Sequence, residues 1–138
     1  MMAAVSINYW AVLAATVAAI VVGFLWYGPL FGKTWMRLMG MGKKKMDKNM
    51  KKEMMKSYII LVITTLITSY VLAHFVKYLG TTLADALQTA FWIWLGFIAT
   101  IQIGIVLWDG KPWKLYILNA AHQLVSLAVM ASILALWP

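Results

Sequence analysis

Four polar side chains with helical spacing lie inside an apolar stretch near the end of the chain. Asn119, His122, Gln123 and Ser126 stand at positions i, i+3, i+4 and i+7, so on an α-helix they share one face. Polar groups deep in an apolar helix face protein or a water-filled cavity, and an ionisable one marks a candidate site. The face therefore predicts a site for a small ligand, a proton or an ion. The alternative is hydrogen bonding between helices, at about 0.6–2 kcal/mol per bond.

Other apolar stretches contain partners for this face. Gln102 precedes it in the third stretch, and the second stretch offers the hydroxyls of Thr64, Thr65 and Thr68. Trp26 and Tyr27 end the first stretch and are a candidate inner gate. The predicted ligand-binding set is therefore Asn119, His122, Gln123, Ser126, Gln102, Trp26 and Tyr27.

The sequence contains few of the features that are typical of an enzyme. The chain has no cysteine, and it shows no glycine-rich phosphate loop or nucleophile-elbow motif. Asp85 and Asp109 are expected at opposite ends of the apolar helices, and Asp109 begins a turn with Gly110. His74 is expected near the outer surface, in a hydrogen bond or ion pair. We therefore expect no catalytic residue, no metal site and no cofactor.

The elements that carry these residues are predicted by composition and hydropathy. Hydrophobic residues make up 64% and charged residues 12% of the 138 residues, against roughly 45–50% and 25% in globular proteins. Four mostly apolar stretches, residues 7–27, 57–78, 84–108 and 115–137, reach the length of ~20 residues that a helix needs to cross a bilayer. The sequence predicts an all-α integral membrane protein with four transmembrane helices in one domain, residues 1–138.

The basic residues predict the orientation in the membrane. Nine of the twelve lie in the segment 33–56, and the positive-inside rule places this loop in the cytoplasm and both termini outside. The net charge of +8 therefore indicates a membrane surface, and we expect no nucleic acid as a partner. Lys43–Lys56 is expected to contact anionic lipids, at about 1 kcal/mol per charge, with an acidic partner protein as the alternative.

Local signals refine these elements. Gly28-Pro29 ends the first helix, and the residues up to Met39 predict a short interfacial helix. Gly40-Met41-Gly42 breaks that helix, and the second long helix is expected to begin near Met46 as a basic cytoplasmic stem. Small residues recur every four positions in the first stretch and predict close packing against a neighbour. These are Ala11, Ala15, Ala19 and Gly23.

Several of these landmarks, taken together, resemble a known family. They are Trp26-Tyr27-Gly28-Pro29-Leu30-Phe31-Gly32-Lys33 with Trp35-Met36, then Trp94-Leu95-Gly96-Phe97, then Asn119-Ala120-Ala121-His122-Gln123-Leu124 before Ala135-Leu136-Trp137. The chain resembles the bacterial membrane family called domain of unknown function 1761 over nearly its full length. The resemblance implies a small four-helix, multi-pass protein of the prokaryotic cytoplasmic (inner) membrane. It implies no activity and no site residue.

The polar face and the predicted topology favour binding or transport of a small solute or ion. Four helices enclose little room for a pore, so transport is expected to need a homo-oligomer. The alternative is a non-catalytic structural or partner-binding membrane protein, in which the polar face only holds helices together.

Overall fold

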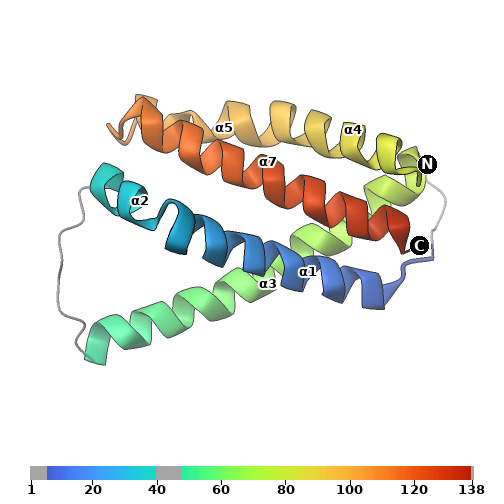
Figure 1. Ribbon diagram of the computed structural model, residues 1–138, viewed down its shortest axis with the longest axis horizontal. Coiled ribbons are helices and arrows are strands. Elements are labelled where there is room, and N and C mark those ends of the chain that lie inside the picture. Colours follow the sequence, from blue (N-terminus) through green and yellow to red (C-terminus); the bar gives the residue numbers. More distant parts are fainter. Residues whose placement is uncertain (1–5, 40–47, 138) are drawn as a thin grey trace.

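The computed structural model describes residues 6–39 and 48–137, and these residues are almost entirely helical (Figure 1). No strand occurs in this part of the chain, in agreement with the predicted all-α class. In chain order the segments are α1 (Tyr9–Leu25), the π-helical segment η1 (Trp26–Leu30), α2 (Gly32–Met39), α3 (Lys48–Leu79), α4 (Leu83–Ile93), the π-helical segment η2 (Trp94–Ala99), α5 (Thr100–Gln102), α6 (Gly104–Leu107) and α7 (Trp113–Leu136).

Four helical stretches are long and apolar enough to cross a membrane. They are Tyr9–Leu30, Lys48–Leu79, Leu83–Leu107 and Trp113–Leu136, and the shortest has 22 residues. At 1.5 Å per residue, 22 residues extend about 33 Å, which is sufficient for a hydrocarbon core of about 30 Å. Many large apolar side chains on these helices are exposed, as contact with lipid requires. The chain is therefore a multi-pass membrane protein.

The last helix, α7, is the centre of the bundle. It packs against α1, α3 and α4, and Figure 1 shows it lying between α1 and α4. The predicted small-residue face of α1 is buried at this packing, and α4 and α7 also bury alanines there. Because alanine side chains are short, helix backbones can approach closely in lipid. The buried alanines include Ala11, Ala15 and Ala19 of α1, Ala86 and Ala90 of α4, and Ala131 and Ala135 of α7.

The second long helix, α3, has 32 residues, or about 48 Å at 1.5 Å per residue, so it exceeds the thickness of a hydrocarbon core. Its first turns carry residues 48–56, the last part of the predicted basic segment, and they diverge from the other helices in Figure 1. Lys56 and Glu53 form an exposed ion pair there, with an Nζ–Oε1 distance of 3.7 Å. The predicted helix start near Met46 and the predicted break at residues 40–42 lie outside the described residues.

The first span ends in a distorted turn, where Gly28-Pro29 was predicted to end the helix. The N–H of Phe31 donates to the carbonyl of Trp26, five residues earlier, at 2.9 Å. Gly28 departs from helical geometry with φ −109° and ψ −106°. The chain then turns so tightly that a Cβ at position 32 would lie 2.7 Å from the carbonyl oxygen of Tyr27. The short helix predicted after this turn is confirmed as α2, and its interfacial location stays a prediction.

The third span is less regular than the sequence analysis expected. A π-helical segment, η2, follows α4, and a turn at Ile103 separates α5 from α6. π-helical segments are rare and occur frequently at functional sites. Here η2 begins with Trp94, whose indole N–H donates to the carbonyl of Ala120 on α7 at 2.7 Å. The irregular part of the third span is therefore anchored to the helix that carries the polar face.

Candidate functional site

The candidate site begins with a hydrogen bond between the first and last spans. The Tyr27 hydroxyl, on η1, donates to Oδ1 of Asn119, on α7, at 2.7 Å. Tyr27 also contacts Trp35 of α2, with ring centroids 5.7 Å apart. Both residues of the hydrogen bond are partly buried. The distorted end of the first span thereby places its aromatic side chains against the polar face of α7.

His122 lies one turn beyond Asn119 and contacts both aromatic residues of η1. Its ring centroid is 4.9 Å from that of Tyr27 and 6.0 Å from that of Trp26. Its Nε2 lies 3.3 Å from the Oγ of Ser126, which is buried. Gly23 lies beside the imidazole, and a Cβ at position 23 would meet Nε2 at 3.5 Å, an ordinary van der Waals distance. We call Trp26, Tyr27, Asn119, His122 and Ser126 the aromatic–polar cluster.

Three buried polar atoms in and near this cluster have no hydrogen-bond partner among the described residues. They are Nε1 of Trp26, Nδ1 of His122 and Oε1 of Gln102. A buried polar atom without a partner costs about 1–3 kcal/mol, and such atoms commonly mark a water, an ion or a functional role. Buried donors and acceptors that could bind a ligand therefore lie in and beside the aromatic–polar cluster, where the sequence predicted a site.

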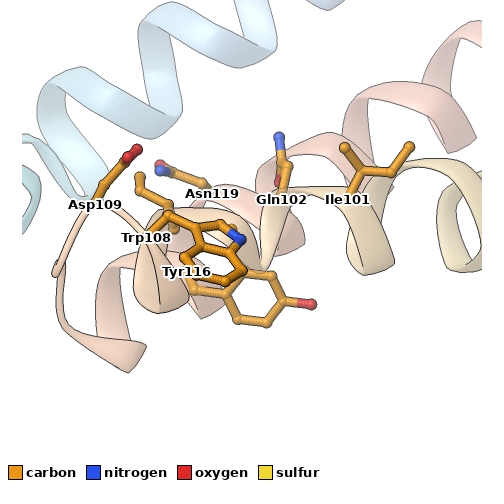
Figure 2. Close-up of a pocket in the computed structure, with 8 residues that line it drawn as sticks. Ile101, Gln102, Trp108, Asp109, Tyr116 and Asn119 are labelled. Carbon is orange, nitrogen blue, oxygen red and sulfur yellow. The ribbon is translucent and has the colours of Figure 1, made fainter.

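A cavity of about 420 Å³ adjoins the cluster at Asn119 (Figure 2). A volume of this size is within the range of small-molecule sites. Figure 2 shows the carboxylate of Asp109 and the amides of Asn119 and Gln102 pointing toward the same side of the cavity. The lining residues are Ile101, Gln102, Gly104, Ile105, Trp108, Asp109, Tyr116 and Asn119.

The turn in the third span and the loop after it shape this cavity. The N–H groups of Trp108 and Asp109 both reach the carbonyl of Gly104, at 2.8 and 3.4 Å. Gly110 follows with φ +68°, a left-handed conformation that glycine adopts without steric cost. Another lining residue, Tyr116, donates its hydroxyl to the carbonyl of Ala99 at 2.6 Å. Trp108 and Asp109 are exposed, so they lie at the mouth of the cavity.

The structure brings together most of the predicted site residues. Five of them form the aromatic–polar cluster, and Gln102 lines the cavity beside Asn119. Gln123 is half-buried, and among the described residues no hydrogen bond connects it to the cluster. Two of the three threonines proposed as partners were wrong, because the hydroxyls of Thr64 and Thr68 donate to carbonyls of their own helix. The proposal for Thr65 stays a prediction.

The contribution of the Trp108–Asp109 turn to the site was not predicted from the sequence. Asp109 was read only as part of a turn, and Tyr116 was not singled out. A carboxylate directly after an apolar span was the available signal, but sequence alone did not show that this span turns at Ile103 toward α7.

His74, the second histidine, does not belong to the aromatic–polar cluster. Its Nδ1 lies 2.9 Å from the carbonyl of Tyr70 on its own helix, and its ring contacts the Tyr70 ring at 4.7 Å. Of the two predicted alternatives, a hydrogen bond is confirmed, and the described residues show no ion pair between His74 and Asp85.

Comparison with known proteins identifies one matching family. A family model described as "Protein of unknown function (DUF1761)" matches residues 10–135. This range includes the whole aromatic–polar cluster and every residue that lines the cavity. No curated protein and no solved structure matches the chain.

Proposed function

The chain belongs to the DUF1761 family, and from that premise we propose that it binds a small polar solute or ion between η1, the end of the third span and α7. The observation that supports this most directly is the three unpartnered buried atoms on Trp26, His122 and Gln102. A bound solute or ion that pairs with these atoms would offset a cost of about 1–3 kcal/mol for each.

Transport is the more specific form of this proposal. The Tyr27–Asn119 hydrogen bond then acts as the inner gate, and the distorted turn at Gly28 and Pro29 lets the aromatic residues of η1 move. Because four helices enclose little room, a path across the bilayer would lie between copies of the chain. A homo-oligomer in the prokaryotic cytoplasmic membrane, with the basic segment in the cytoplasm, belongs to this proposal.

A structural function is the second candidate, and the hydrogen bonds between helices favour it. Trp94 and Tyr116 donate to backbone carbonyls of neighbouring spans at 2.7 and 2.6 Å. Together with the Tyr27–Asn119 bond, they join α7 to the first and third spans. In this alternative the polar face stabilises the bundle, and the chain serves as a structural or partner-binding protein.

Native mass spectrometry of the full chain, released gently from detergent, separates the two candidates. If the site binds a ligand, wild-type protein carries a reproducible extra mass that His122→Ala removes with little change in melting temperature. Ser132→Ala is the matched control, since Ser132 lies on the same helix and donates to its own Ala128 carbonyl. A lower melting temperature with an unchanged mass would instead support the structural function.

A second variant covers the case in which His122→Ala loses both stability and the extra mass. Trp26→Phe keeps an aromatic ring beside His122 and Phe31 but removes the unpartnered indole N–H. Loss of the extra mass without loss of stability supports a binding site. A bare chain in both the wild-type and the variant spectra contradicts the binding proposal.

A further inference from the structure

The cavity carries a negative charge, whereas the chain as a whole is strongly basic. Among the described residues that line it, only Asp109 carries a charge, and it is negative. Lys111, two residues later, is not among the lining residues, and its Nζ donates to the carbonyl of Met39 on α2 at 3.4 Å. The cavity is therefore acidic within a strongly basic chain.

The two amides of the cavity offer NH2 donors and oxygen acceptors, and the acceptors suit a ligand that donates hydrogen bonds. Oε1 of Gln102 is a buried acceptor without a partner among the described residues. Oδ1 of Asn119 accepts one hydrogen bond from Tyr27 and, like any amide oxygen, has a second lone pair. With the Asp109 carboxylate, three side chains offer acceptors. An ammonium group supplies three donors and no acceptor.

Apolar side chains complete the wall. Ile101 and Ile105 provide aliphatic surface, and the Trp108 indole stands at the mouth. A cation near the face of a tryptophan ring gains further electrostatic attraction. The combination suits a molecule with a cationic head and a short apolar tail.

We infer that this cavity binds a primary ammonium group attached to a short aliphatic chain. This inference rests on the proposed binding function and specifies its ligand class. The ammonium contacts the Asp109 carboxylate and the Asn119 amide oxygen, and the aliphatic part lies along Ile101, Ile105 and Trp108. Two sources supply such a group in a membrane: a free alkylamine and the headgroup of phosphatidylethanolamine.

Three probes of matched size test the charge preference. Butylammonium, butyramide and butyrate are titrated calorimetrically into the full chain in phosphatidylcholine nanodiscs, with empty nanodiscs as the blank. Butylammonium is expected to bind roughly tenfold or more tightly than butyrate, because a hydrogen bond to a charged partner is worth about that factor. Butyrate binding as tightly as butylammonium, or no binding of butylammonium, overturns the inference.

Removing the carboxylate tests the residue. Asp109→Asn keeps the shape of the side chain and is expected to weaken butylammonium binding roughly tenfold, with little effect on butyramide. Asp85→Asn is the matched control, since Asp85 lies outside this cavity and follows the N-cap of α4. Unchanged butylammonium affinity in Asp109→Asn overturns the assignment.

A competition experiment identifies the source of the ammonium group. If phosphatidylethanolamine in the nanodiscs displaces butylammonium from wild-type protein but not from empty discs, the headgroup is the ligand. If it does not, a free amine is the ligand, and both results support ammonium recognition. Binding of butyrate or butyramide that requires His122 would leave the proposed binding function standing while excluding this ligand class.

Discussion

The Tyr27 hydroxyl and the Asn119 side-chain oxygen, 92 residues apart in sequence, are 2.7 Å apart in the structure. The hydrogen bond between them joins the distorted end of the first span to the polar face of the last. It also holds the Tyr27 ring against His122. The proposed site depends on this contact, and its energetic contribution can be measured directly.

Replacing Tyr27 by phenylalanine removes the hydroxyl and leaves the Asn119 oxygen without that donor. We expect the free energy of unfolding to fall by about 0.6–2 kcal/mol, the usual contribution of such a bond between membrane helices. Unfolding of the detergent-solubilised chain measures this change. Tyr58→Phe is the control, because the Tyr58 ring contacts Phe24 but its hydroxyl has no partner among the described residues. Equal stability of both variants and wild type would show that the bond contributes nothing.

Gln102→Leu removes the unpartnered amide oxygen from the cavity wall. In the absence of ligand we expect a gain in stability of about 1 kcal/mol or more, because a buried acceptor without a partner is eliminated. Thermal unfolding in detergent is the measurement, with Gln88→Leu, at an exposed position of α4, as the control. A clear loss of stability in Gln102→Leu alone would mean that the oxygen is satisfied in the folded protein.

Gly23 is predicted to tolerate alanine but not a larger residue. A Cβ at this position meets only Nε2 of His122, at an ordinary contact distance of 3.5 Å. Alanine in place of glycine within a helix should raise stability by about 0.5–1 kcal/mol. Gly23→Leu would overfill the space beside the imidazole at a cost of about 1–3 kcal/mol. The order of melting temperatures, alanine above wild type above leucine, is the expected result, and a leucine variant as stable as wild type contradicts it.

Gly32→Ala tests the close approach of α2 to η1. The added Cβ would lie 2.7 Å from the Tyr27 carbonyl oxygen, so the backbone must shift, at a cost of about 1–3 kcal/mol. The matched substitution is Gly96→Ala, where no atom lies within 4 Å of the added Cβ. We expect chemical unfolding to show a loss only at position 32. Similar stabilities of the two variants would indicate that α2 is free to move away.

The candidate site was predictable to the extent that it depends on one helix. Because the positions of Asn119, His122 and Ser126 repeat with the helical period, their common face follows from spacing alone. Trp26 and Tyr27 were candidates because they end the first span beside Gly28-Pro29. The threonines of the second span were equally plausible candidates in the sequence. In the structure, however, the exposed hydroxyls of Thr64 and Thr68 donate to backbone carbonyls of their own helix.

The sequence by itself determined the class of the protein, because four long apolar stretches with their charges between them leave few alternatives to a helical membrane bundle. It also determined the shared face of α7 and the break after the first span, since helical period and proline geometry act over a few residues. Only the tertiary structure decided that Tyr27 reaches Asn119, that the third span turns at Ile103, and that Asp109 borders the cavity. These features depend on which helices pack together and where their irregular turns fall, and such contacts join residues far apart in the chain.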